Sequence, residues 1–181
     1  MGLGALGGAR LATAEPPPPE PTLLQGPQGP LQFRMDSLTA DASSHTVTGS
    51  GHVVLRQDGW LMCCSALLGR TNAQWAWQEI TCQGDVRLWF DHKYLTADSA
   101  VFYPDHHEVI LRGRPRVQEN EHELLGARMV LNTQRQALQI DRPRGRVMPQ
   151  KLSKAMPKSA EPAFLRGPLP DVCPLERPSP P

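Results

Sequence analysis

The chain has 181 residues, with 19 lysines and arginines against 18 aspartates and glutamates, a formal net charge of +1. This near-neutral balance argues against a protein that recruits nucleic acid through its bulk charge. The sequence also contains no run of the ~20 apolar residues that a transmembrane helix needs, which argues against a spanning segment of that kind.

The first 14 residues are predicted to be a truncated signal peptide. Ala12-Thr13-Ala14 has the small-x-small pattern of a signal-peptidase site, and a proline-rich stretch follows it. A basic region is missing before it, and Arg10 interrupts the short apolar run. Two interpretations remain: a longer signal has lost its beginning, or the similarity is accidental.

The prolines divide the rest of the chain. Of 19 prolines, seven lie within 16–30, nine within 149–181 and three between these segments. Proline-rich segments bury too little apolar surface to offset the entropy that is lost on ordering. We therefore expect a disordered linker over 15–32, a folded domain over 33–147 and a disordered tail over 148–181.

Within the expected domain, a short phrase recurs four times. The copies are HTVTGSGHVVL at 45–55, QEITCQGDVRL at 78–88, HEVILRGRPRV at 107–117 and QALQIDRPRGRV at 136–147. Aligned on Val47, Ile80, Val109 and Leu138, successive copies lie 33, 29 and 29 residues apart, and the first three share a glycine at one offset: Gly51, Gly84 and Gly113. A fixed period of this size indicates stacked repeats.

Each copy alternates apolar with polar residues, which is the period-two pattern of a half-buried strand. The shared glycine stands in mid-strand, where it predicts a bend or a bulge. Further strands are expected between the copies, and the segments that join them carry turn residues. These strands lie at 61–68, 95–103 and 125–131, and the turns at 57–59, 91–93, 104–106 and 132–134. The sequence thus predicts a nearly all-β chain of strand-turn-strand units.

The apolar positions of these strands form one predicted inward row. Its members are Val53, Leu55, Ile80, Val86, Leu88, Phe90, Val101, Val109, Leu111, Val117, Met129, Leu131, Leu138 and Ile140. Such a row is either a packed core or a groove for lipid acyl chains. Periodicity alone does not separate the two hypotheses.

Five arginines share the opposite parity: Arg87, Arg114, Arg116, Arg144 and Arg146. Like charges that face each other across a strand ladder destabilise it unless an anion or solvent screens them. One hypothesis is a cationic stripe that binds phosphate groups or an acidic partner, since a guanidinium binds phosphate through two donors. The alternative is a solvated face that also discourages edge aggregation.

The four cysteines, Cys63, Cys64, Cys82 and Cys173, lack the spacing of a metal site. In an oxidising compartment we expect a disulfide between Cys82 and either Cys63 or Cys64, which leaves Cys173 unpaired. The alternative is that the cysteines are small buried hydrophobic residues.

Other chemical motifs give little support for catalysis or for a cofactor. The histidine-containing turns at 105–108 and 119–123 lack the ligand pairing of a known metal site. Trp75 and Trp77 are expected to pack at a rim. The sequence shows no nucleophile elbow, phosphate loop or dinucleotide fingerprint, so we expect no enzyme, no metal and no cofactor.

One stretch resembles a known family. Residues 95–117 read LTADSAVFYPDHHEVILRGRPRV, the pattern L-x-A-D-x-A-V-x-Y, then a D-x-H turn, then E-V-x-L-x-G-x-x-x-V. This pattern resembles the OstA-like (LptA) family of periplasmic lipopolysaccharide-transport proteins, with a looser match over 35–147. The chain departs from the family where an asparagine often follows the glycine. It has His52, Asp85 and Arg114 there, and Arg142 in place of the fourth glycine.

The resemblance implies a V-shaped β-jelly roll built from about four strand-turn-strand repeats. It further implies a periplasmic protein that carries lipopolysaccharide (lipid A), or a related amphiphile, passively between the inner and outer membranes. Its partners would be LptC-like and LptD-like jelly-roll domains, or further copies of itself, paired head to tail through edge strands. Two alternatives remain: a structural adaptor that joins envelope proteins without binding lipid, and a polysaccharide-binding repeat that uses the arginines.

Overall fold

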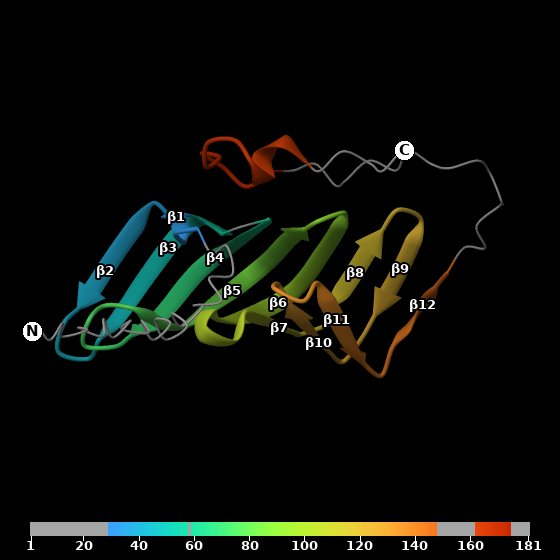
Figure 1. Ribbon diagram of the computed structural model, residues 1–181. Coiled ribbons are helices and arrows are strands. Elements are labelled where there is room, and N and C mark those ends of the chain that lie inside the picture. The colour runs from blue at the N-terminus through green and yellow to red at the C-terminus, as the bar shows by residue number, and fades with distance from the viewer. Residues whose placement is uncertain (1–28, 58, 148–161, 175–181) are drawn as a thin grey trace, which may run out of the picture.

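The computed structural model describes residues 29–57, 59–147 and 162–174 (Figure 1). These residues form strands and two short 3-10 helices, so the prediction of a nearly all-β chain is confirmed. The strands are β1 (Gln32–Arg34), β2 (Ser37–Asp41), β3 (Thr46–Gln57), β4 (Trp60–Thr71), β5 (Trp77–Phe90), β6 (Lys93–Tyr103), β7 (Glu108–Arg112), β8 (Arg116–Glu119), β9 (His122–Leu125), β10 (Arg128–Asn132), β11 (Ala137–Asp141) and β12 (Arg144–Arg146). The 3-10 helices are η1 (Pro104–His106) and η2 (Ala163–Leu165).

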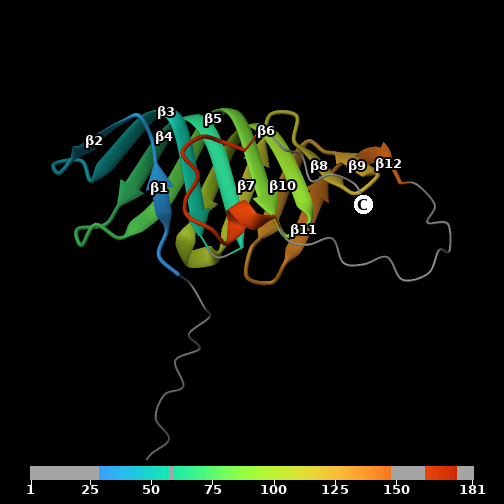
Figure 2. The same ribbon diagram turned by 90° about the horizontal axis from the view of Figure 1, so that it is seen from above.

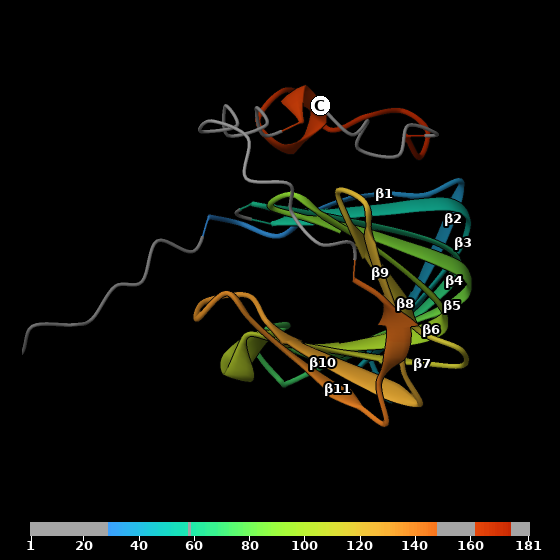
Figure 3. The same cartoon turned by 90° about the vertical axis from the view of Figure 1, so that its right-hand side faces the viewer.

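The strands form a single antiparallel sheet that is folded over into two halves (Figure 3). The long strands β3 to β6 cross the bend and belong to both halves. Half A has the strand order β1-β3-β4-β5-β6-β8-β9-β12, and half B has the order β2-β3-β4-β5-β6-β7-β10-β11. The result is the expected V-shaped β-jelly roll, which does not close into a barrel.

The bend lies where the repeated glycines predict it. Each glycine and the residue after it adopt left-handed backbone angles, and the strand register shifts beside Gly51 and beside Gly84. At the third corner, φ is 73° at Gly113 and 55° at Arg114. An inserted residue of this kind bends a strand and increases its twist, so three successive corners fold the sheet along one line.

Two of the corners repeat the same contacts. At each of them, the backbone N–H of an aspartate donates to the carbonyl of the corner glycine. The carboxylate of the same aspartate pairs with the side chain of the residue that follows this glycine. The pairs are Asp36 with Gly51 and His52, and Asp98 with Gly113 and Arg114; the N···O distances are 2.9 and 3.0 Å for the backbone and 2.7 and 3.1 Å for the side chains. At the fourth corner the carbonyl of Asp141 accepts from the N–H of Ala127, and Arg142 adopts the left-handed angle.

The later corners interrupt the strands that the sequence predicts as continuous. The copy at 107–117 is divided between β7 and β8, and the expected strand at 125–131 is divided between β9 and β10. Pro115 lies in the first interruption, and its carbonyl accepts from the N–H of Gly126, 3.1 Å away, in the second. Because proline has no N–H to donate to a ladder, the strand ends before it.

The predicted domain boundaries differ from the structure at both ends. Residues 29–32, which we assigned to the linker, belong to the fold: the Gln57 side chain donates to the carbonyl of Gly29 over 3.1 Å, and Leu31 packs against the core. Residues 162–174, which we assigned to a disordered tail, pack on the outside of half A. The predicted signal peptide and the rest of both predicted tails lie outside the described residues.

The space between the halves is filled by one apolar cluster. Eleven members of the predicted inward row are buried in it: Val53, Leu55, Ile80, Val86, Leu88, Phe90, Val109, Leu111, Val117, Met129 and Leu131. The prediction is wrong for Val101, which pairs with Thr81 and Ile110 on the outside of half B, while Ala100 and Phe102 point inward. β6 crosses the bend without an inserted residue. The alternation of inward and outward positions is therefore offset by one residue across the bend, so that Ala97 faces inward on one side of it and Ala100 on the other.

We predict that Gly113→Ala destabilises the domain more than Gly59→Ala. Both glycines have a left-handed φ, 73° and 74°. At either position, an alanine with this angle destabilises the domain by about 1–2 kcal/mol. A Cβ at Gly113 would lie 2.5 Å from Asp98 Cβ, whereas nothing lies within 4 Å of one at Gly59. The corner substitution therefore costs about 1–3 kcal/mol more, measured by urea unfolding. Equal losses would mean that the corner has room to adapt.

Candidate functional site: an apolar interior open at two edges

The interior is sealed along its middle and exposed at its ends. Its central residues, such as Leu55, Leu88 and Leu111, are almost completely buried. The inward-facing residues of the first edge strands are not: Phe33 of β1 and Leu38 of β2 are each 44% exposed. Since large exposed apolar side chains gather at interaction sites, the ends of the interior are the candidate site.

The first opening lies between β1 and the start of β5. Phe33 meets Trp77 edge to face, with ring centroids 6.3 Å apart, so the two aromatic rings come from opposite halves of the sheet. Trp77 also covers Gly69, where a side chain would collide with the indole ring. Trp75 instead stands 46% exposed beside His45, with ring centroids 6.1 Å apart. Of the two tryptophans predicted to pack at a rim, Trp77 packs against the core and Trp75 remains exposed.

The second opening lies at the other end of the sheet. Leu138 and Ile140 of β11, the two remaining members of the predicted row, are half-buried against the cluster, as is Leu124 of β9. They face the interior from the last strand of half B and the next-to-last strand of half A. The apolar cluster therefore extends through the domain and is only partly covered at both edges.

Each edge also presents unpaired backbone. Within the described residues, β1 and β2 pair only with β3, β11 pairs only with β10, and β12 pairs only with β9. The side chains of β1, β2 and β12 are exposed throughout. Open strands of this kind are templates for pairing with another chain.

The arginines do not form a continuous stripe. Arg87 and Arg116 share a row on the outside of half A, but Thr96 of β6 lies between them. Three of the five have acidic neighbours: Arg87 with Asp85, Arg114 with Asp98 and Arg116 with Glu123, at N···O distances of 2.9, 3.1 and 3.0 Å. Arg144 and Arg146 are exposed on β12. Among these five arginines, the two without an acidic neighbour in the described ion pairs therefore lie at the second edge.

The outside of half A carries a second apolar cluster beneath residues 162–174, which we call the strap (Figure 2). Val54, Leu61 and Trp89 are buried under it. Leu165 of the strap is buried among them, and Phe164 meets Trp89 edge to face with ring centroids 5.6 Å apart. Sequence reasoning missed this contact, although the apolar run Ala163-Phe164-Leu165 inside a proline-rich tail is a signal for it.

Polar contacts fasten the strap to the first strands. The guanidinium of Arg56, which is nearly buried, donates to the carbonyls of Phe164 and Gly167 and to the side chain of Gln32 in β1. Arg34, also in β1, pairs with Asp171 of the strap. The strap therefore holds the edge strand β1 as well as the sheet face behind it.

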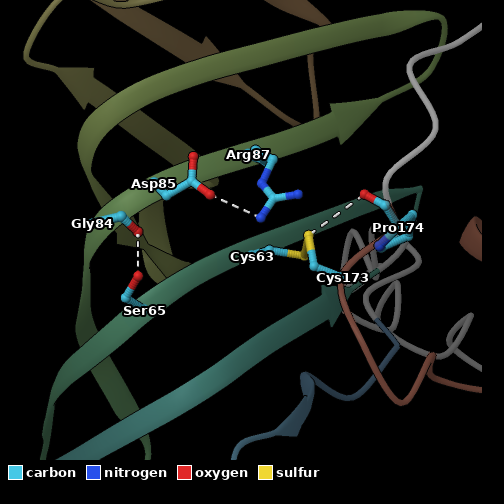
Figure 4. Close-up of a disulfide and its surroundings, with 7 residues drawn as sticks. All are labelled: Cys63, Ser65, Gly84, Asp85, Arg87, Cys173 and Pro174. Atoms are coloured by element: carbon cyan, nitrogen blue, oxygen red, sulfur yellow. Dashed lines mark hydrogen bonds and ion pairs between the residues drawn. A yellow bond between two sulfur atoms is a disulfide. The ribbon is translucent and has the colours of Figure 1, made fainter.

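A disulfide between Cys63 and Cys173 closes the strap (Figure 4). The predicted pairing of Cys82 is wrong, and Cys173 is not left over. Alternation along β4 places Cys63 on the outer face and Cys64 in the interior cluster. Cys64 and Cys82 are buried free thiols, and their hydrogen bond together with burial raises the pKa of Cys82, so this thiol stays protonated.

The described part of the chain holds neither a metal-binding cluster nor a helix that could span a membrane. No group of three or more histidine, cysteine or acidic side chains is arranged to hold a metal ion there. None of its helices is long and apolar enough to cross a membrane.

An antiparallel repeat sheet, bent into a V around an apolar interior and open at both edges, defines an OstA-like β-jelly roll. Residues 34–137, more than half of the chain, match the family described as "LptA/(LptD N-terminal domain) LPS transport protein". The chain therefore belongs to this lipopolysaccharide-transport family, as the repeated motif indicates.

A solved structure supports the same fold. It is LptH from Pseudomonas aeruginosa, described as the LptA homologous periplasmic component of the conserved lipopolysaccharide transport device. The TM-score is 0.59 at 15% sequence identity, and the match covers 66% of this chain and 96% of LptH. No curated protein matches this chain significantly.

We predict that Cys173→Ser lowers the free energy of unfolding by about 2–4 kcal/mol, because the disulfide closes a long loop. The two cysteines are 110 residues apart in sequence. Urea unfolding followed by tryptophan fluorescence measures the change, since Trp89 lies under the strap. Val172→Ala is the matched control, because Val172 is 61% exposed beside the same disulfide. A loss as small as that of the control would show that the disulfide contributes nothing to stability.

Proposed function

We propose that this chain is a periplasmic carrier that passes lipopolysaccharide, through its lipid A acyl chains, between jelly-roll domains of the transport machinery. One observation carries the proposal. The apolar interior is buried in the middle, and its exposed members stand at the two edges where another domain would dock. An acyl chain in such an interior leaves water, which contributes about 0.8 kcal/mol for each buried CH₂ group.

The geometry supports passive handover between domains. Among the described residues, the halves share backbone pairing only through the strands that cross the bend. The opposite side of the V has no ladder to break, so the halves can part there to admit acyl chains. Transport then needs only a path of lower free energy than water, with the driving energy supplied by another component.

The strand directions support head-to-tail stacking. Every pairing is antiparallel, and each half contains eight strands in series within the described residues. The first and last strands of a half therefore run in opposite directions. A second jelly roll placed end to end pairs its β1 with β12 and its β2 with β11, and both junctions continue the antiparallel ladder. LptC-like and LptD-like domains, or another copy, are the proposed partners.

The arginines have a secondary part in this proposal. Arg144 and Arg146 lie on the edge strand beside the second opening. Phosphate groups of lipid A that leave the interior at this edge meet two guanidinium groups, each of which binds phosphate through two donors. The acidic neighbours named above pair with the other three arginines, Arg87, Arg114 and Arg116. These three have no part in the proposed phosphate binding.

A structural adaptor remains the second candidate, because the middle of the interior is fully packed. An adaptor uses the same open edges and binds no lipid. The two candidates therefore differ in one measurable property, the contact of inward edge residues with lipid.

We predict that a photo-cross-linking residue, p-benzoylphenylalanine, gives a lipopolysaccharide adduct at position 38 and not at position 68. Leu38 and Leu68 are 44% and 42% exposed, but they face opposite sides of half B. The adducts are measured by immunoblotting after ultraviolet irradiation of cells. Equal adducts at both positions would indicate non-specific surface contact, and an absence of adducts at both would favour the adaptor.

Self-association is expected to weaken at least tenfold in Leu38→Asp and to stay unchanged in Leu68→Asp. A carboxylate at the open edge has to be desolvated when another domain closes over it, and 1.4 kcal/mol already corresponds to a factor of ten. Sedimentation velocity over a concentration series measures both variants. Equal association of the two would exclude the inward edge as the docking surface.

A further inference from the structure

β1 is the weaker of the two edge strands at the first opening. It pairs with β3 through three residue pairs, whereas β2 pairs with β3 through five. All of its side chains are exposed, and Phe33 reaches across the opening to Trp77. A strand with few buried contacts opens at a low cost in free energy. β1 therefore needs support from outside the ladder to serve as a template for another chain.

The strap gives β1 this support. Phe33 faces the interior, so alternation places Gln32 and Arg34 on the outer side of half A, where the strap lies (Figure 3). Arg34 forms an ion pair with Asp171 of the strap. Gln32 accepts a hydrogen bond over 3.2 Å from Arg56, the residue opposite it on β3. Both outward side chains of β1 are thus fixed by the strap or by a residue that the strap holds.

Arg56 connects the strap to β1. This residue is only 9% exposed, and its guanidinium group donates to the carbonyls of Phe164 and Gly167 as well as to Gln32. A buried guanidinium group is tolerated when acceptors satisfy its donors. Two of these three acceptors belong to the strap. When the strap leaves, the guanidinium group has to turn toward water, and Gln32 loses the donor that fixes it.

The disulfide keeps the strap on these partners. Cys173 follows Asp171 by two residues, and its bond to Cys63 holds this end of the strap on β4. In the reduced protein only noncovalent contacts retain the strap, among them the ring of Phe164 on Trp89. Loss of the covalent link lowers the effective concentration of the strap at its receiving surface. Reduction therefore increases the fraction of molecules in which β1 is free to open.

We propose that the strap is a clamp that holds β1 in the position for pairing with another jelly roll, and that docking of half A therefore requires the Cys63–Cys173 disulfide. Arg56 is the positioning residue of this clamp. The inference rests on the head-to-tail assembly of the proposed function. β2 belongs to half B, whereas the strap packs on the outside of half A. The disulfide thus controls the junction at β1 and leaves the edge at β2 unchanged.

The size of the effect follows from the population of molecules with β1 in place. When only a fraction of the protein presents the competent strand, the apparent dissociation constant rises by the reciprocal of that fraction. A β1 strand that is in place about one tenth of the time weakens association about tenfold. The open fraction also sets the rate of amide exchange in β1. Exchange and association therefore report the same population independently.

Hydrogen exchange tests the clamp without docking. The full-length protein is compared with and without dithiothreitol, below the concentration at which it assembles. Cys64 and Cys82 are free thiols, so the reagent has one target: the disulfide gains two electrons and two protons, and dithiothreitol is oxidised to its cyclic disulfide. Reduction is expected to accelerate exchange severalfold in peptides that cover β1 and not in those that cover β2 or β11. Unchanged exchange at β1 would overturn the clamp.

Sedimentation velocity over a concentration series tests the effect on docking. We expect reduction to weaken self-association about tenfold or more. Arg56→Gln is expected to weaken association of the oxidised protein by the same factor and to abolish any further effect of dithiothreitol, which general destabilisation would not do. Arg112→Gln is the matched control, because Arg112 is exposed on β7 in half B, and this variant is expected to keep the full redox response.

Two checks keep the role of Arg56 open to refutation. Circular dichroism and a count of two free thiols in denaturant show whether Arg56→Gln is folded and oxidised. Gln32→Ala removes the same link from the exposed strand β1 and is expected to reduce the redox response in the same direction. A full redox response in both variants would overturn the positioning role.

The two redox states separate this inference from the proposed function. Equal association of the oxidised and the reduced protein would overturn the clamp and leave head-to-tail stacking intact. A protein that associates in neither state would overturn the stacking of identical copies, and with it the inference. Association of the oxidised protein alone, with β1 exchange that changes by a matching fraction, supports both.

Discussion

The structure depends on one constraint: an open repeat sheet has to bury an apolar face without a second layer of other elements. The sheet does this by folding over on itself. Residue pairs such as Gly51-His52 and Gly113-Arg114 hold left-handed angles at the same level of successive strands. Glycine adopts these angles without steric cost, and the paired aspartates fix the residue that follows it. The corners therefore turn a row of apolar positions into an interior.

The same geometry creates the two ends of that interior. A sheet that folds along a line, and does not close, keeps its first and last strands free. Phe33 and Leu38 at one end, and Leu138 and Ile140 at the other, are apolar residues that the domain alone does not fully cover. Unpaired backbone and incompletely buried apolar side chains thus occur at the same places. Docking another jelly roll, as proposed, would satisfy both at once.

The strap answers a different physical problem. Val54, Leu61 and Trp89 make the outer face of half A apolar, and exposed side chains of this size would favour aggregation. The strap covers them and a disulfide retains it, although its own sequence is rich in proline and has little regular structure. It lies beyond the residues that match the family and adds a second set of contacts to the jelly roll.

The sequence by itself determined the features that arise locally: the strand alternation, the repeat period, the corner glycines and, through them, the family. Tertiary structure decided whatever depends on partners distant in the chain. Val101 faces outward because β6 crosses the bend without an inserted residue, which offsets its inward positions by one. The alternating pattern of the sequence does not show where such an offset occurs. Cys63 joins Cys173 across 110 residues because the strap lies over β4. Local pattern fixes which residues can be buried, and only long-range packing fixes what they are buried against.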